Sequence, residues 1–188
     1  CFELQAAKQD KFATSQNSNT QYAYHLDSSL YAQMLHDYCE TRGVVRKEGK
    51  IEYVHQNKET GYIEYLQLAS GEVIHGDFFI DCTGFKGLLI EETLKTGYED
   101  WSQWLPCDRA IAVQTESVDA PRPITMAIAH DSGWQWKIPL QHRTGNGLVY
   151  CSQYLSDDDA KQRLLDNVIG KTITTPRVIK FKTGRRLQ

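Results

Sequence analysis

The segment Trp134–Pro139, WQWKIP, carries the sharpest structural signal in the sequence. Alternate residues of a β-strand point to the same face, so Trp134, Trp136 and Ile138 predict one large apolar surface. The two polar residues between them point the other way. Pro139 cannot donate to a strand ladder, which places it at the end or the edge of a strand. Two tryptophans packed in the core of a β-sheet are the simplest explanation of this pattern.

Strand-like runs surround this segment and are separated by proline or glycine. They predict a mostly antiparallel sheet from residues 109–115, 123–130, 134–139, 147–154 and 178–181. Gly145–Gly147 is typical of a hairpin turn. Ser156 predicts the N-cap of a helix, because the aspartates at 157–159 then occupy the first turn, where the helix dipole favours negative charge.

The first half of the chain predicts a helix that starts after a short extended stretch. Asp27 is a good N-cap for a helix that runs to about Arg42. A polar run at 11–21 predicts a loop, and Tyr22–His25 predicts a short strand. Apolar residues at helical spacing predict the buried stripe of this helix, namely Leu30, Tyr31, Met34, Leu35 and Tyr38.

The next segments predict a second sheet region. Alternating runs at 50–55, 62–68 and 73–75 predict a small meander. Phe78–Cys82, FFIDC, is a nearly unbroken apolar run, which is typical of a strand buried on both faces and would make Cys82 an inert core thiol. A helical run at 88–94 follows. Together these elements predict a mixed α/β (α+β) fold with two sheet regions.

Composition argues against several classes of function. The 188 residues carry a formal net charge of −3, which gives no electrostatic reason to expect nucleic acid or an anionic membrane as a partner. No apolar run is long enough to cross a bilayer. The five cysteines show no C-x-x-C motif and the six histidines show no zinc-binding spacing. We therefore expect reduced thiols, a cytoplasmic protein and no metal; helix capping explains the three aspartates at 157–159 better than a metal site does.

Several ordered blocks resemble one family, the flavin-dependent halogenases, best represented by the tryptophan halogenases. The W-x-W-x-I-P pattern at 134–139 is the signature of that family. One hexapeptide could arise by chance, but several blocks in the family's order and at comparable spacing make chance a poor explanation. The similar blocks, which together cover about residues 20–186, are YAYHLD at 22–27, FIDCTGFKGLLI at 79–90, WLPCDRA at 104–110 and IPLQHRTGNG at 138–147.

The resemblance implies a fold, a cofactor and a reaction. The fold would be part of an FAD-dependent aromatic monooxygenase-like fold, of the p-hydroxybenzoate hydroxylase type. Residues 1–107 would belong to the FAD-binding domain and residues 108–188 to a substrate-side β-sheet domain. Reduced FAD, supplied by a partner flavin reductase, would combine with O2 and halide to generate hypohalous acid, which halogenates an indole- or tryptophan-like aromatic. The cofactor supplies the oxidation, and the protein supplies orientation and exclusion.

The resemblance also assigns roles to residues of the tryptophan segment. Trp134 and Trp136, with Ile138 and Pro139, would lie near the flavin. A steric role fits their size, because bulky indoles would keep an organic substrate away from the oxidised cofactor and favour attack by halide over hydroxylation.

Two further positions are candidates for contact with FAD. Ile51 matches a family position that passes the adenosine end of FAD and would make its contact through the main chain. Asp81 and Gly84 belong to a turn after a strand, where α/β sheets place ligands. An ordinary strand residue and an ordinary turn remain open as explanations of these positions.

The chain lacks parts that the family has. The G-x-G-x-x-G segment that holds the FAD pyrophosphate is absent, and the catalytic Lys and Glu of the family fall outside these residues. Both ends read as cut, so we expect an incomplete internal piece that is inactive alone. A flavin monooxygenase that hydroxylates an aromatic and a non-catalytic remnant of the family stay open as alternatives. A homodimer is compatible with the sequence.

Overall fold

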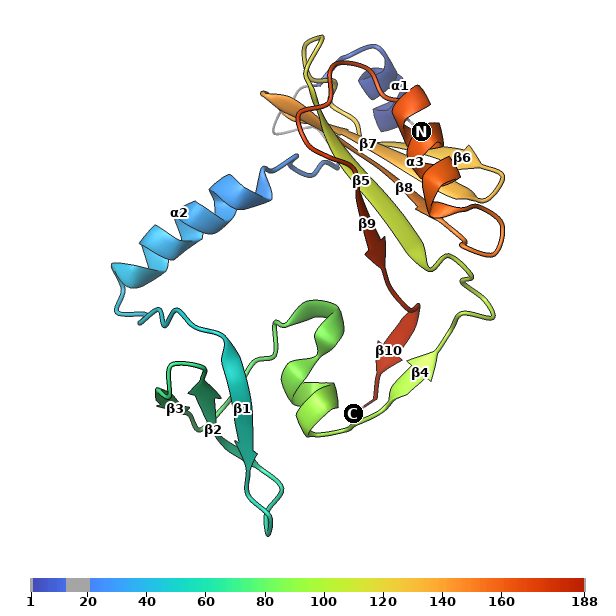
Figure 1. The fold of residues 1–188 in the computed structure, drawn as a ribbon. Helices are drawn as coiled ribbons and strands as arrows, with labels where there is room; N and C mark the ends of the chain where they lie inside the picture. The colour runs from blue at the N-terminus through green and yellow to red at the C-terminus, as the bar shows by residue number, and fades with distance from the viewer. Residues whose placement is uncertain (1, 13–20, 188) are drawn as a thin grey trace. The chain divides into compact units, whose positions relative to one another are not determined.

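The computed structural model describes residues 2–12 and 21–187 (Figure 1). The chain divides into two compact units. The first unit contains residues 1–33 and 102–183, and the second contains residues 34–101 and 184–188. The assignment of residues 1–107 to FAD and of residues 108–188 to the substrate side is a statement about function and stays a prediction. The mixed α/β class is confirmed by the helices and antiparallel sheets of both units.

The first unit is built on a five-stranded antiparallel sheet with the strand order β6-β7-β8-β5-β9. The predicted strands at 109–115, 123–130, 134–139 and 178–181 are confirmed, the second with a later start. The strands are β5 (Arg109–Glu116), β6 (Met126–His130), β7 (Gly133–Pro139), β8 (Arg143–Tyr150) and β9 (Arg177–Lys180).

The predicted hairpin turn at Gly145–Gly147 is wrong. Strand β8 already begins at Arg143, so the turn lies at 140–142 and the two glycines are inside the strand. A glycine can mark a turn, but Gly147 is needed here because a larger residue would clash with a neighbouring side chain. A Cβ built at Gly147 would overlap the Trp136 indole on the neighbouring strand. Glycine inside a strand often marks such a close approach.

Helix α3 (Asp157–Asp166) covers one face of this sheet and closes the main core (Figure 1). Ser156 is confirmed as its N-cap, because its Oγ accepts a hydrogen bond from the Asp159 N–H at 3.1 Å. The Tyr150 hydroxyl donates to the Asp157 carboxylate at 2.7 Å and joins β8 to the first turn of the helix. The core consists of Ile111, Val113, Leu148, Tyr150, Leu155, Ala160 and Leu164.

The second unit contains the predicted meander, which is confirmed. Its order is β1-β2-β3 with antiparallel pairing throughout. Across the three strands, the rings of His55 and Tyr65 stack with centroids 4.5 Å apart, and His75 lies 5.4 Å from Tyr65. The elements of this unit are β1 (Ile51–Gln56), β2 (Ile63–Leu68), β3 (Val73–His75), the 3-10 turn η1 (Gly84–Lys86), the π-helix η2 (Leu88–Thr93), β4 (Tyr98–Asp100) and β10 (Gly184–Arg186).

The predicted buried strand at Phe78–Cys82 is wrong. The segment is not in a strand, and Phe78 and Ile80 are 83% and 78% exposed. Cys82 is exposed as well, so it is no core thiol. An apolar run becomes a buried strand only where neighbouring strands pair with it, and no strand of the described residues pairs with this one.

The helix predicted after Asp27 is confirmed as α2 (Ser28–Glu40), but its predicted buried stripe is not buried. Helical spacing shows which side chains share a face and does not show whether another element covers that face. Tyr22–His25 forms no strand, and α1 (Phe2–Lys8) is a helix that the sequence did not predict. Most of the loop predicted at 11–21 lies outside the described residues. Within the described ranges, no helix is both long and apolar enough to cross a membrane.

We predict that Leu164→Ala destabilises the first unit by about 2–5 kcal/mol, because it removes a fully buried side chain and leaves a cavity between α3 and the sheet. Leu105→Ala is the matched control, since Leu105 is 53% exposed, and it should change stability by less than about 0.5 kcal/mol. Urea unfolding measures both. Equal effects of the two substitutions would contradict the position of the core.

Candidate functional site

The tryptophans of β7 lie on the face of the sheet that α3 does not cover. Gln135, between them, is only 1% exposed and pairs with the core residue Leu148. Because side chains alternate along a strand, Trp134 and Trp136 point to the opposite face. Trp134 is 43% exposed, and Trp136 is half-buried. The interpretation of Trp134 and Trp136 as residues packed in the core of the sheet is therefore wrong.

Small residues surround the Trp136 indole on this face. Trp136 is opposite Ala127 on one side and Gly147 on the other, and Gly147 is opposite Ala112. The centroids of the two indoles are 6.0 Å apart, with ring planes inclined by 55°. Since no side chain stands on Gly147, the Trp136 ring can lie over the backbone of β8. The result is a wall of two indoles over a floor of small residues, which we call the tryptophan wall.

The other face of the same strands holds a group of buried polar side chains that the sequence reading missed. The Asn146 amide donates to the Thr115 hydroxyl at 3.2 Å and to the Thr144 carbonyl at 3.3 Å. The Gln135 amide donates to the Asn167 carbonyl at 3.4 Å. A slip of β7 by one residue would bury the indoles and expose Gln135, so the burial of Gln135 and its hydrogen bond favour the register that turns the indoles outward.

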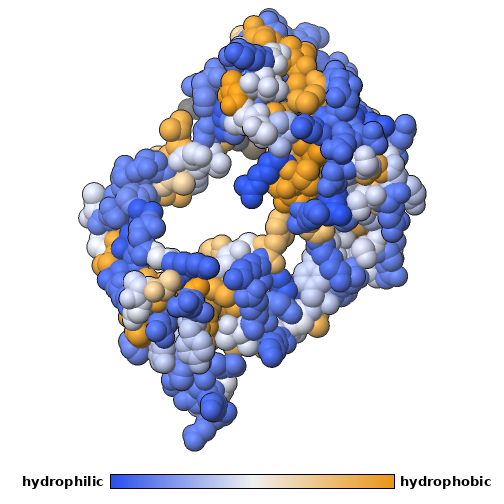
Figure 2. Space-filling model, in the orientation of Figure 1, coloured by the Kyte–Doolittle hydropathy of each residue, from blue (hydrophilic) through white to orange (hydrophobic). Residues whose placement is uncertain are grey.

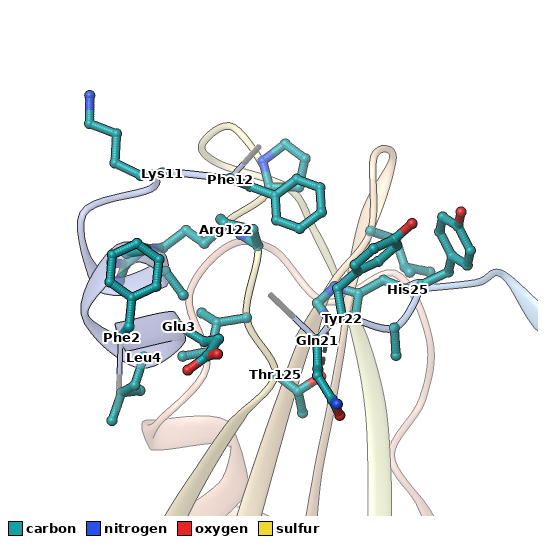
Figure 3. A pocket seen from close by; sticks show the side chains of 18 of the residues that line it. Phe2, Glu3, Leu4, Lys11, Phe12, Gln21, Tyr22, His25, Arg122 and Thr125 are labelled. Atoms are coloured by element: carbon teal, nitrogen blue, oxygen red, sulfur yellow. Dashed lines mark hydrogen bonds between the residues drawn. The ribbon is translucent and has the colours of Figure 1, made fainter. Parts of the chain in front are cut away.

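An open cavity of about 1110 Å³ lies beside the Pro139 end of β7 (Figure 3). It is lined by α1, residues 21–25, residues 121–125, Leu140 and Gln141. Tyr22 forms edge-to-face ring pairs with Phe12 and Tyr24, at centroid distances of 5.3 and 5.7 Å. The lining comes from segments that are far apart in the sequence, so no motif could have predicted it.

Asp81 organises a turn in the second unit. One carboxylate oxygen accepts from the N–H and hydroxyl of Thr83, and the other accepts from the N–H groups of Leu89 and Ile90, at 2.7–3.0 Å. Burial alone would raise the pKa of Asp81, but these hydrogen bonds outweigh it and lower that pKa to about 2. The carboxylate thus ties the start of η2 to the end of the Phe78–Cys82 segment.

Arg186 on β10 holds the same turn from the other side. Its guanidinium donates to the Phe85 carbonyl at 2.9 Å and forms an ion pair with Glu91 at 2.8 Å. Gly87 has a φ of 56° and lies against this guanidinium, whereas a Cβ on Gly84, with a φ of 68°, would meet nothing within 4 Å. The turn is therefore supported on the Arg186 side and open at Gly84.

Ile51 begins β1, which is an edge strand of the meander, so one side of its main chain has no strand partner among the described residues. The structure places Ile51, Asp81 and Gly84 in the second unit and the tryptophan wall in the first. Within the described residues, no group of three or more His, Cys, Asp or Glu side chains is arranged to hold a metal ion. The four described cysteines are free thiols.

Apolar side chains reach the molecular surface in several patches (Figure 2). The stripe of α2 contributes one such set, with exposed fractions from 38% for Leu35 to 67% for Leu30. Phe78, Ile80 and Phe85 contribute another, at 72–83%. Such patches commonly mark surfaces that other protein segments or ligands cover.

Comparison with known proteins gives one consistent result. The family model described as tryptophan halogenase matches residues 1–188. The chain is 37% identical over 171 residues to the tryptophan 7-halogenase RebH of Lentzea aerocolonigenes, which covers 88% of the chain and 32% of RebH. It is similar to the solved structure of Xcc4156, a flavin-dependent halogenase from Xanthomonas campestris, with 50% identity and a TM-score of 0.95 over 99% of the chain and 38% of Xcc4156.

A second solved structure, BrvH, a flavin-dependent halogenase from Brevundimonas sp. BAL3, has 46% identity and a TM-score of 0.88 over 96% of the chain and 38% of BrvH. The chain spans about a third of the length of the curated relatives it matches. These likenesses confirm the expected fold class, because the chain follows the halogenase structures over nearly all of its own length.

We predict that Gly147→Ala displaces the Trp136 indole, because the new methyl group would occupy the position of that ring. Gly145→Ala is the matched control on the same strand and face, since a Cβ there meets its nearest atoms at 3.7 and 3.8 Å, which is ordinary contact. Tryptophan fluorescence should shift in the first variant and stay unchanged in the second. Identical spectra for both variants would contradict the placement of Trp136 over Gly147.

We predict that the hydrogen bonds of Asp81 stabilise the turn above its ordinary pKa of 3.8 and are lost as the pH falls toward about 2. Asp81→Asn puts an amide N–H against backbone donors, so exchange of the Leu89 and Ile90 amides at neutral pH should become about tenfold faster. Hydrogen exchange followed by NMR measures this. Asp77→Asn, at an exposed position, is the control, and equal acceleration in both variants would refute the role of Asp81.

Proposed function

The chain belongs to the tryptophan halogenase family, and from that membership we propose that its protein is an FADH2-dependent halogenase, an oxidoreductase that halogenates an aromatic substrate of the indole or tryptophan type. The observation that carries the proposal is the tryptophan wall, which presents two indoles on the sheet face opposite α3. Because the chain spans about a third of its relatives' length, the proposal concerns the whole protein.

The tryptophan wall fits a planar cofactor on its exposed side. The floor beside Trp136 is flat, since Ala112, Ala127 and Gly147 carry at most a methyl group. Trp134 keeps 43% of its surface exposed and can make contact with a further group. An aromatic face of this kind favours contact with another aromatic ring system by stacking or edge-to-face packing.

The tryptophan wall acts by exclusion. FAD, when bound in reduced form, supplies the oxidising chemistry with O2. With FAD bound near this face, Trp134 and Trp136 would block the approach of an organic substrate to the flavin, while a halide ion would be small enough to pass. The two indoles therefore favour halogenation, and the burial of Gln135 with its hydrogen bond to the Asn167 carbonyl keeps β7 in the register that turns them outward.

The cofactor-side contacts proposed for the second unit use the main chain. Asp81 already accepts four hydrogen bonds within its own turn, so we assign it the shaping of that turn. The open backbone at Gly84 and the unpaired edge of β1 at Ile51 are the positions that could approach FAD closely. We propose that residues 1–107 serve FAD and residues 108–188 the substrate side. A separate flavin reductase as the electron source and a homodimeric assembly belong to the same proposal.

Hydroxylation of the aromatic is the second candidate reaction, since it uses the same cofactor and the same fold class. Product mass separates the two reactions, because one adds halogen and the other adds oxygen. The two outward-facing indoles favour halogenation, since smaller side chains at these positions would leave the oxidising centre open to the organic substrate.

We predict that the double substitution Trp134→Phe with Trp136→Phe lowers the ratio of halogenated to hydroxylated product about tenfold, which corresponds to ~1.4 kcal/mol of lost discrimination. The assay supplies the whole protein with FAD, a flavin reductase, halide and an indole substrate, and reads product mass. Trp104→Phe, at an exposed tryptophan outside the wall, is the control. An unchanged product ratio in the double variant would contradict the exclusion role of the two indoles.

A further inference from the structure

A histidine from the first part of the chain holds the end of the strand that carries the tryptophans. The His25 Nδ1 lies 2.8 Å from the Pro139 carbonyl oxygen. Its Nε2 lies 3.0 Å from the hydroxyl of Thr125, and both of these residues are labelled in Figure 3. A carbonyl can only accept, so Nδ1 carries the proton and donates it. In the neutral ring, Nε2 then accepts from the Thr125 hydroxyl, and both ring nitrogens are used.

Asp27 makes a second attachment two residues further on. One carboxylate oxygen accepts from the Ser29 N–H at 2.9 Å and caps α2. The other accepts from the Arg143 guanidinium at 3.0 and 3.2 Å and lies 3.0 Å from the His142 Nε2. The Asp27 and Arg143 side chains are only 12% and 15% exposed, so this pair is shielded from water far better than a surface ion pair.

The two attachments grip the β7–β8 hairpin on both sides of its turn. Pro139 ends β7, and Arg143 begins β8. The pairing of β7 with β6 ends at Lys137 and Met126, so Pro139 has no strand partner on that side among the described residues. A strand end without a partner strand frays more readily than the middle of the strand, and His25 gives the Pro139 carbonyl a partner that opposes that fraying.

We propose that His25 is a positioning residue that fixes the Pro139 end of β7, with Asp27 fixing the adjoining start of β8, so that the indoles of the tryptophan wall keep one orientation. His25 touches neither indole and acts through the strand. Trp136 lies three residues from the carbonyl that His25 holds, and β7 transmits the constraint along its backbone.

The two ring nitrogens of His25 have different partners, so substitutions can separate their contributions. An asparagine places an amide N–H near the position of the histidine Nδ1, whereas a glutamine reaches toward the position of Nε2. His25→Asn should therefore keep the bond to the Pro139 carbonyl and lose the one to Thr125. His25→Gln should do the reverse, and His25→Ala should lose both.

The test reads the indole N–H signals of the four tryptophans in the 15N-labelled chain by NMR, with assignments from single Trp→Phe variants. His25→Ala is expected to shift or broaden the signals of Trp134 and Trp136 and to leave those of Trp101 and Trp104 in place. His25→Asn is expected to restore the wild-type signals, and His25→Gln is not. His36→Ala is the matched control, because His36 pairs with Asp37 and Glu40 of its own helix, α2.

Three results would overturn the proposal. The Trp134 and Trp136 signals could stay unchanged in His25→Ala, all four signals could change together, or His25→Gln could restore the spectrum as well as His25→Asn does. If His25→Ala does not fold, the comparison of His25→Asn with His25→Gln carries the test, and wild-type Trp134 and Trp136 signals in His25→Gln count against the proposal. The measurement needs neither flavin nor halide, so it stands or falls separately from the proposed function.

Discussion

The pairing of β7 with β8 is the interaction on which the rest of the first unit depends. This ladder fixes which residues of the WQWKIP segment face α3 and which face away. Because the side-chain period of a strand is two, the same ladder decides at once the burial of Gln135 and the exposure of Trp134. Gly147 makes the ladder compatible with a large ring on the facing strand. The packing of the core, the position of the tryptophan wall and the register of β7 are therefore all determined by the same strand pairing.

In the second unit, hydrogen bonds and an ion pair hold the turn that leads into η2. Asp81 gathers four donors from Thr83, Leu89 and Ile90, and Arg186 reaches the same turn from the end of the described chain. Charged groups that each satisfy several backbone partners can fix a loop where apolar packing is sparse. The turn is thus stiff in its interior while Gly84 leaves its outer side accessible.

Local patterns in the sequence predicted the elements that local physics determines. Ser156 and Asp27 cap helices because a short polar side chain before a helical run satisfies free N–H groups, and that rule needs no tertiary information. The pattern of β7 predicted the shared face of Trp134 and Trp136 in the same way, but not which side of the sheet would be covered. Burial of the α2 stripe and strand formation at Phe78–Cys82 depend on partners distant in the chain, and there the predictions failed. The polar group around Asn146 joins side chains from β5 and β8, so no single segment could reveal it.

The attachment of residues 25–27 to the β7–β8 hairpin also has a consequence for how the chain folds. The contacts that join His25 to Pro139 and Asp27 to Arg143 close loops of 114 and 116 residues, whereas the hairpins of β6, β7 and β8 are local. Contacts between distant residues carry a larger loop-closure entropy and form late in folding. During synthesis residues 25–27 are made first, and their partners in the β7–β8 hairpin are made much later. The sheet therefore presents its tryptophan face before His25 holds the Pro139 end of β7, and transiently exposed apolar surface of this kind favours misassociation of the growing chain.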